Sequence, residues 1–215
     1  QGKSIDGVFG EMSIGRNIFR GIIKGLAYFF FRPTVEYADK SIKDLKGPVI
    51  FICNHTSHYD GAMVSAVLSK WQPCILIAKD WADKKNVGAL FRLYGSVPVN
   101  RREMDTEWFF EAQKRMESGE SFLIFPEGKT SKGEMNDFQP GFAILAEKMN
   151  APIVTCAVYG RYKFVFGPRM HMVVGGRYEA ECPPDLRKSI YARQLAKDMQ
   201  GEVQQLKNGL AETAQ

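Results

Sequence analysis

Short apolar runs alternate with longer segments of helical periodicity between Val49 and about Gly175. The runs have the length of buried strands, and the segments between them repeat their apolar residues at the three- and four-residue spacing of helices. Such alternation is typical of an α/β protein with a mixed, largely parallel sheet that is covered by helices on both faces. We therefore expect this fold class, preceded by an amphipathic N-terminal helix.

The periodicity also predicts where the elements lie. The expected strands span residues 49–53, 74–78, 97–99, 121–125, 152–158 and 170–175. The expected helices span residues 14–32, 60–69, 87–94, 104–117, 138–149 and 186–206. A chain of 215 residues is long enough for one such domain and short for two.

The N-terminal segment is both apolar and basic. Between residues 14 and 32 apolar side chains recur at helical spacing, with basic residues among them, and the pattern ends at Pro33. Such a helix can pack on the protein's own core, lie in a membrane interface, or do both. The apolar run 25–31 is far shorter than the ~20 residues that span a bilayer, so we expect no crossing. We assign residues 1–33 to a membrane-associating helix and residues 34–215 to a single α/β domain with a C-terminal helix.

The net charge and the cysteines of the sequence limit which classes of partner and which cellular compartment we expect. A net charge of +5 and a pI near 9.0 favour an anionic partner: a nucleic acid, a phosphorylated metabolite or an anionic membrane. No nucleic-acid recognition motif is present, so we expect no nucleic-acid partner. Three of the four cysteines lie in or beside apolar runs and are expected to be reduced core thiols, which favours the cytosol or the cytosolic face of a membrane. The cysteines are Cys53, Cys74, Cys156 and Cys182.

A histidine and an aspartate five positions apart follow the first expected strand. Side chains five apart differ by roughly 140° around a regular helix, so His55 and Asp60 cannot face each other from one straight helix. A strand, a turn over residues 54–57 and a helix beginning at Tyr59 or Asp60 would fold the histidine back over the carboxylate. The pair would then form an acid–base site in which Asp60 holds the ring and favours its charged form.

Other interpretations of this segment stay open at the level of sequence. Asp60 could serve only as a helix N-cap, and His55 could be a buried histidine with satisfied hydrogen bonds. His55, His58 and Asp60 could ligate a metal, but His171 is remote and no Cys-x-x-Cys pair exists, so we expect no metal. Ser57 could act as a nucleophile, but its neighbours do not form a Gly-x-Ser-x-Gly elbow.

Two later loops carry groups suited to binding a substrate, and both follow expected strands, where α/β folds gather their sites. In the first, an extended piece leads into Arg101, whose planar guanidinium suits a phosphate or a carboxylate. In the second, Glu127 offers an acceptor and Gly128 a backbone that a ligand can approach closely. Lys129 adds a cation. Each of these residues could equally belong to a solvated turn.

Taken in order, these segments resemble the sequence blocks of the glycerolipid acyltransferase family, in particular the 1-acylglycerol-3-phosphate acyltransferases. The matches are Asn-His-x-x-x-x-Asp at 54–60, a glycine and short apolar run ending in arginine at 95–101, Phe-Pro-Glu-Gly at 125–128 and a proline-led apolar strand at 151–154. The resemblance spans about Pro48 to Val158. Residues 129–131 read Lys-Thr-Ser where the family often has Thr-Arg-Ser, and Thr155 replaces a second proline. The first change loses a guanidinium fork, which leaves the identity of the acceptor open.

The resemblance implies a reaction. A fatty acyl group would pass from acyl-CoA or acyl carrier protein, a co-substrate and not a bound cofactor, to the free hydroxyl of 1-acylglycerol-3-phosphate, giving phosphatidic acid. His55 would take the hydroxyl proton and Asp60 would orient the ring, without an acyl-enzyme.

The resemblance also implies roles for the two later loops. Arg101, helped by Lys129, would hold the phosphate of the lysophospholipid acceptor. Glu127 would bind polar groups of the acceptor or brace Arg101. Backbone amides near Gly128 would face the developing oxyanion.

Lipid substrates imply a location as well. We expect the N-terminal helix to dock the protein, peripherally or monotopically, on the cytosolic face of an anionic membrane. Two alternatives remain: the same chemistry on another lysolipid acceptor, and a membrane-bound interaction protein that keeps the fold without turnover.

Overall fold

The structure is a computed structural model that describes residues 5–85, 87–100, 106–131, 133–160 and 168–213, with side chains from residue 14 to residue 211. Its helices are α1 (Ile5–Phe31), the 3-10 helix η1 (Lys40–Asp44), α2 (Asp60–Val67), α3 (Lys79–Ala82), α4 (Gly88–Tyr94), α5 (Glu107–Glu117), α6 (Gly141–Met149) and α7 (Lys188–Thr213). Its strands are β1 (Thr34–Tyr37), β2 (Ile50–Cys53), β3 (Cys74–Ala78), β4 (Val97–Val99), β5 (Phe122–Ile124), β6 (Ile153–Tyr159) and β7 (His171–Tyr178).

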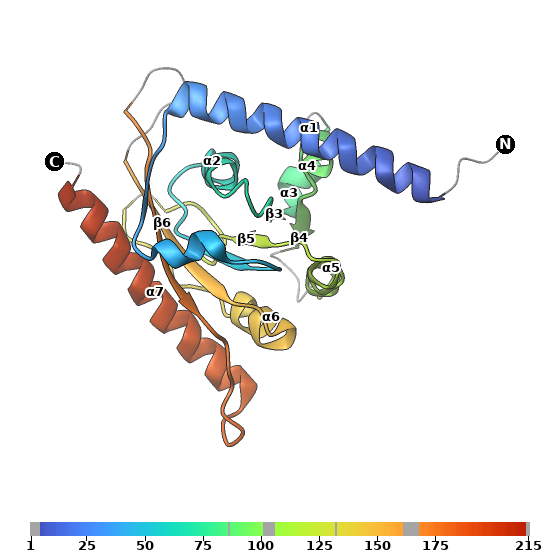
Figure 1. Ribbon diagram of the computed structural model, residues 1–215. Coiled ribbons are helices and arrows are strands. Elements are labelled where there is room, and N and C mark those ends of the chain that lie inside the picture. The colour runs from blue at the N-terminus through green and yellow to red at the C-terminus, as the bar shows by residue number, and fades with distance from the viewer. Residues whose placement is uncertain (1–4, 86, 101–105, 132, 161–167, 214–215) are drawn as a thin grey trace.

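In the described part of the chain these strands form one seven-stranded sheet in the order β1-β7-β6-β2-β5-β3-β4. All neighbouring strands are parallel except β6 and β7, which run antiparallel. Helices α1, α2 and α4 cover one face of the sheet, and α5, α6 and α7 cover the other (Figure 1). The predicted fold class, a mixed and largely parallel sheet with helices on both faces and an N-terminal helix before it, is confirmed.

Strand β2 shows why the sheet needs a cover on each side. All four of its residues are fully buried. Because successive side chains of a strand point to opposite faces, Ile50 and Ile52 enter one core while Phe51 and Cys53 enter the other. A strand that is apolar at every position is stable only between two layers of helices.

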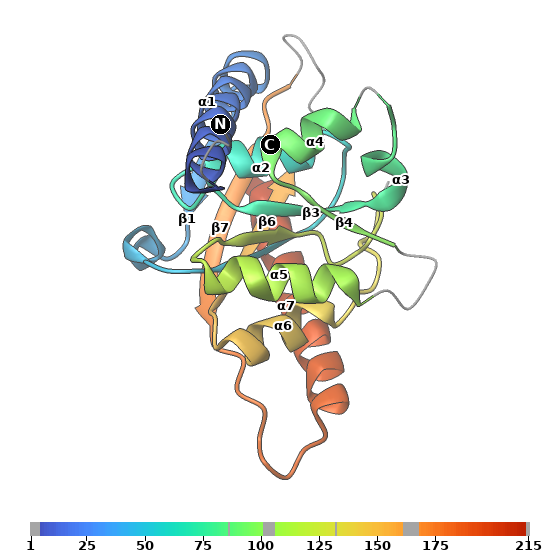
Figure 2. The ribbon, with the colours of Figure 1, turned by 90° about the vertical axis from the view of Figure 1, so that its right-hand side faces the viewer.

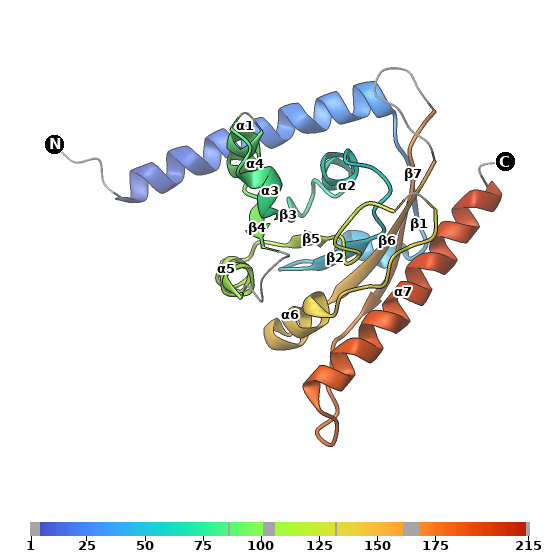
Figure 3. The ribbon, with the colours of Figure 1, turned by 180° about the vertical axis from the view of Figure 1, so that it is seen from behind.

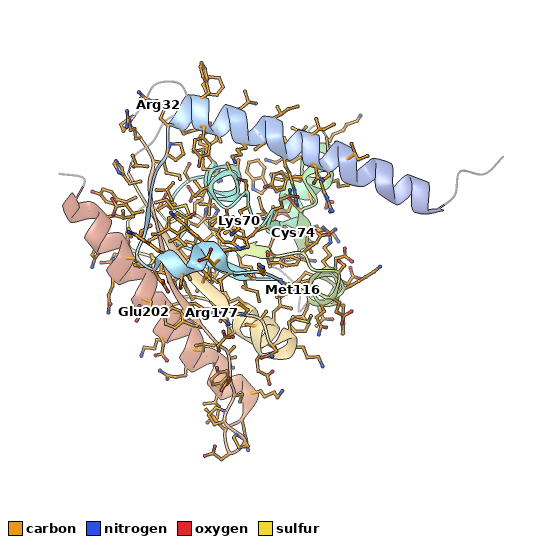
Figure 4. The ribbon with its side chains drawn as sticks, viewed as in Figure 1. Arg32, Lys70, Cys74, Met116, Arg177 and Glu202 are labelled. Carbon is orange, nitrogen blue, oxygen red and sulfur yellow. The ribbon has the colours of Figure 1, made fainter. Side chains whose placement is uncertain are left out.

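The two cores are therefore separate, one on each face of the sheet (Figure 2). The core under α1, α2 and α4 contains Ala27, Phe31, Met63, Val64 and Tyr94. The core under α5, α6 and α7 contains Cys74, Met116, Phe142, Leu145 and Val203, of which Cys74 and Met116 are labelled in Figure 4.

Helix α1 belongs to the first of these layers. Its inner face packs Phe19, Ile23 and Ala27 toward the core. Its Arg20 reaches further, because Nε donates to the carbonyl of Tyr94 at 3.0 Å and Nη1 donates to the carbonyl of Gln72 at 2.8 Å. None of the helices within the described ranges is long and apolar enough to cross a membrane.

Several boundaries differ from those predicted. Strand β1 and helix η1 were not predicted, because β1 is a four-residue edge strand whose place is set by pairing with β7, from Thr34 opposite His171 to Tyr37 opposite Val174. Short helix α3 was missed as well. Helix α1 begins at Ile5 and not at Ile14, and α7 continues to Thr213. The start predicted for the helix over residues 104–117, at Met104, lies outside the described residues.

Candidate active site

The first and third sequence blocks meet at one edge of the sheet. Strands β2 and β5 are parallel neighbours, and Ile52 pairs with Ile124 near the carboxyl ends of both. Parallel neighbours end at the same edge, so residues 54–60 and 125–131 leave the sheet side by side. This edge holds every described residue that we predicted for the site.

The predicted turn brings His55 and Asp60 together. The Nδ1 atom of His55 lies 2.9 Å from Oδ2 of Asp60, whose side chain is fully buried. The same oxygen accepts the backbone N–H groups of Thr56 at 2.6 Å and Ser57 at 2.9 Å. Asp60 is the first residue of α2, which is a favourable end of a helix for negative charge.

This arrangement fixes the orientation of the imidazole ring. A carboxylate only accepts hydrogen bonds, so the Nδ1 of His55 carries a proton, and in the neutral ring the lone pair is on Nε2. The side chain of His55 is 19% exposed, so substrate can reach it. The alternative in which Asp60 is only an N-cap is wrong, because the N-cap position of α2 is occupied by Tyr59.

Residues of the β5 loop hold His55 by its backbone and by the face of its ring. Its N–H donates to Oε1 of Glu127 at 2.6 Å. Its carbonyl accepts from the backbone N–H of Ser131 at 2.7 Å and from the hydroxyl of Ser131 at 3.2 Å. The ring of Phe125 stacks on the imidazole at a centroid distance of 4.5 Å. His55 is thus positioned from both loops.

Glu127 is a buried bracing group, with only 4% of its surface exposed. Besides the bond from His55, its Oε2 accepts the backbone N–H of Asn136 at 2.9 Å and the side-chain amide of Asn136 at 3.1 Å. Both oxygens are thus engaged within the protein, whereas the resemblance implied that Glu127 binds polar groups of the acceptor or braces Arg101. The predicted partner Arg101 lies outside the described residues. Asn136 was not predicted to take part in the site, since nothing in its local sequence marks it.

Gly128 and Lys129 follow in the same loop. Gly128 adopts a left-handed conformation with φ of 69°, and its N–H donates to the carbonyl of Phe125 at 3.0 Å. That bond closes a tight turn. The expectation that backbone amides near Gly128 face the oxyanion stays a prediction. The side chain of Lys129 is exposed beside the turn.

Asn54 ties the site to the next strand of the sheet. Its side chain is fully buried; Oδ1 accepts the N–H of Val158 at 2.7 Å, and Nδ2 donates to the carbonyl of Val158 at 3.0 Å. The amide group therefore continues the pairing of β2 with β6 beyond the last strand residue. We had not assigned it a role, although it opens the first sequence block.

The remaining polar residues nearby have other surroundings. His58 is exposed, and its ring lies 5.5 Å from the ring of Trp81. Within the described ranges no three His, Cys, Asp or Glu side chains are grouped as metal ligands. Cys53 and Cys156 are buried unpaired thiols, as predicted, and burial raises the pKa of each well above its ordinary value of 9.0.

Comparisons with known proteins identify a shared fold and a family. The structure is similar to the crystal structure of the 1-acyl-sn-glycerophosphate (LPA) acyltransferase, PlsC, from Thermotoga maritima, with a TM-score of 0.67 and 16% sequence identity. The match covers 93% of this chain and 81% of that one, and at this identity it establishes a shared fold. A comparison with curated proteins gives no match. A family model described as Acyltransferase matches residues 32–159, more than half of the sequence, and the chain therefore belongs to the acyltransferase family.

Proposed function

We propose that this protein is an O-acyltransferase that moves a fatty acyl group from an acyl thioester to the free hydroxyl of 1-acylglycerol-3-phosphate, giving phosphatidic acid. The observation that carries the proposal is the 2.9 Å contact between His55 and Asp60, with Nε2 left to act as a base. Family membership supports the reaction class. The fold shared with a protein described as an LPA acyltransferase supports the choice of acceptor.

The chemistry follows from the orientation of His55. Nε2 takes the proton of the acceptor hydroxyl while that oxygen attacks the thioester carbonyl, and Asp60 stabilises the resulting imidazolium. The tetrahedral intermediate then collapses, the carbon–sulfur bond breaks, and the imidazolium returns its proton to the departing thiolate. The products are an ester and a free thiol, without acylation of the protein. General-base catalysis of this kind contributes roughly 10²- to 10⁴-fold to the rate.

The phosphate of the acceptor needs a cation to bind it, and the acyl group comes from a thioester donor. The reaction needs no bound cofactor. We assign the acceptor phosphate to Lys129, which is exposed beside the catalytic loop, together with Arg101. Lysine offers a point charge, while arginine adds a planar pair of donors that suits a phosphate. The donor is acyl-CoA or acyl carrier protein.

Replacing His55 by alanine tests the reaction. With lysophosphatidate as acceptor and acyl-CoA or acyl carrier protein as donor, kcat should fall at least about 10²-fold. His58→Ala is the matched control, because it removes an exposed histidine three positions away. Equal activity of His55→Ala and the native enzyme would refute the proposed base.

The loss of an arginine fork at residues 129–131 favours a second candidate acceptor, a different lysolipid used in the same reaction. A lysine in that place discriminates less sharply between headgroups than a guanidinium does. A panel of lysophosphatidate, neutral and zwitterionic lysolipids separates the two. A preference for a headgroup without a free phosphate monoester would replace 1-acylglycerol-3-phosphate by that acceptor.

We further propose that the protein docks on the cytosolic face of an anionic membrane through α1. A stripe of exposed apolar side chains runs along this helix, centred roughly 120° around its axis from the residues that pack on the core. Its members are Ile14, Ile18, Ile22, Leu26 and Phe29, with 47 to 63% of each side chain exposed. An apolar stripe on a basic helix is the composition of interfacial helices.

The double variant Ile18→Ser/Ile22→Ser tests this docking better than deletion of α1, since deletion would uncover the core that Ala27 and Phe31 help to close. The variant should sediment less with anionic liposomes while the melting temperature stays close to that of the native protein. Unchanged sedimentation would exclude α1 as the membrane contact.

A further inference from the structure

Helix α4 exposes apolar side chains beside α1. Leu90 is 51% and Leu93 is 44% exposed. Leu90 lies one turn before Tyr94, and on a helix such residues share a face. The ring of Tyr94 lies 4.8 Å from the guanidinium of Arg20 of α1, so this face of α4 is the one next to α1. The two helices lie in the same layer above the sheet (Figures 2 and 3).

The charges around these apolar residues are mostly positive, because the exposed Asp80 and Asp83 are outnumbered by the cations around them. The sequence contains no Asp or Glu between residues 12 and 35, or between residues 84 and 100. The exposed cations of the two segments are Lys24, Arg32, Lys84, Lys85 and Arg92. On the opposite side of the molecule, α7 mixes Arg193 and Lys197 with Asp198 and Glu202. A surface that combines exposed leucines with an excess of cations complements an anionic lipid bilayer.

The catalytic segment lies between α1 and α3. The ring of Tyr59 packs 5.4 Å from Phe31 at the end of α1. The ring of His58 lies 5.5 Å from Trp81 in α3, and the ammonium of Lys84 lies 3.5 Å above that same indole. The residues that precede Asp60 are thus flanked on one side by α1 and on the other by the basic residues that lead into α4.

We propose that α3 and α4, together with residues 83–85, form a second membrane-contacting element. With α1, they place the catalytic edge of the sheet against an anionic bilayer. Contact through α1 alone would let the molecule rotate about the axis of that helix on the membrane surface. Two contacts, one on either side of residues 55–60, define the orientation of the site. A lysolipid then reaches His55 without leaving the interface. The inference rests on the proposed lipid acceptor.

Two double variants of the full chain test the second contact. Leu90→Ser/Leu93→Ser removes its apolar part, and Lys84→Glu/Lys85→Glu reverses its charge. Sedimentation is measured with phosphatidylcholine vesicles that contain about one third phosphatidylglycerol, a membrane of strongly negative surface potential. Each exposed cation contributes about fivefold to such partitioning, so the charge variant should lower the partition coefficient by more than about tenfold. The leucine variant should lower it by about tenfold as well.

Two controls come from the opposite side of the molecule. Phe110→Ser removes a side chain of α5 that is 66% exposed, more than either leucine, and Arg193→Glu/Lys197→Glu reverses two charges of α7. Both should partition as the native protein does. Native partitioning of the two α3–α4 variants would overturn the inference, as would an equal loss in the controls or failure of the native protein to bind these vesicles.

Acyl transfer to a lysophosphatidate present as monomers separates this inference from the proposed function. The α3–α4 variants should keep native rates with this acceptor and lose activity, at least about tenfold, with acceptor embedded in the vesicles. If the native protein binds vesicles through α3 and α4 but transfers no acyl group to any acceptor, the proposed function fails and the membrane contact stands. If acyl transfer proceeds and the α3–α4 variants bind the vesicles as the native protein does, the proposed function stands and the membrane contact fails.

Discussion

Glu127→Gln separates a bracing role for this residue from a role in binding substrate. The carboxylate has one oxygen on the N–H of His55 and the other on two donors of Asn136. Glutamine keeps one acceptor but puts an NH₂ group in place of the other. In either orientation of the amide, a donor of the protein then faces another donor.

The cost follows from the bonds that are lost. A hydrogen bond to a buried charged group contributes about 1.5 to 3 kcal/mol, and the glutamine variant loses at least one such bond. At about 2 to 4 °C per kcal/mol for a domain of this size, the melting temperature should fall by about 3 to 12 °C. The chain stays folded, because domains are typically stable by about 5 to 15 kcal/mol.

Catalysis should suffer more than binding does. The orientation that loses fewer bonds keeps the glutamine oxygen on the two donors of Asn136, so the lost bond is the one from the N–H of His55 at 2.6 Å. A misplacement of about 1 Å at a catalytic group can cost about 10²-fold in rate. Steady-state kinetics with lysophosphatidate should therefore show kcat lowered roughly 10²-fold and KM little changed. Glu134→Gln, which changes an exposed carboxylate in the same loop, should leave both parameters at native values. A raised KM with native kcat would instead identify Glu127 as a substrate ligand and refute the bracing role.

Three further changes test the framework of the site. Asn54→Ala leaves the buried N–H and carbonyl of Val158 without partners and should lower the free energy of unfolding in urea by roughly 2 to 6 kcal/mol. Gly128→Ala meets open space, so only its left-handed φ of 69° costs stability, about 1 to 2 kcal/mol by thermal unfolding; no change would show that the turn relaxes. Burial raises the pKa of Cys53 and Cys156, so the folded state keeps thiol protons that the unfolded chain loses. Stability should hold below about pH 9 and fall above it, by up to about 1.4 kcal/mol per pH unit for each thiol, with a smaller slope in Cys156→Ala.

The pairing of His55 with Asp60 was predictable because it is local. Five residues, a strand before them and a helix after them leave few ways to arrange the turn, and the structure has the turn that the spacing required. The alternation of apolar runs predicted the sheet for the same reason, since each run must be buried on both faces. Local periodicity thus accounts for most of the elements.

The bracing of the site was not predictable in this way. Glu127 and His55 are 72 positions apart, and the sequence gives residue types without the register of β5 beside β2. Asn136 contributes through its side-chain amide and through a backbone N–H that any residue other than proline carries. The tight turn at Gly128 was not predictable either, because a glycine suits both a turn and a close approach to a ligand, and its sequence position does not say which is present. Long-range partners and backbone donors leave no local signature.

Because the sheet separates the two cores, substitutions in one core should change the free energy of unfolding independently of substitutions in the other. Substitutions far apart and without shared neighbours add in free energy, whereas those in contact couple. Changes within the α5, α6 and α7 core should therefore combine additively with changes around Phe31 and Met63, and coupling between the layers should be largest at β2, whose side chains alternate between them. An engineer can thus raise the stability of this enzyme from the α6 and α7 side while leaving the face that carries α1 and α4 unaltered.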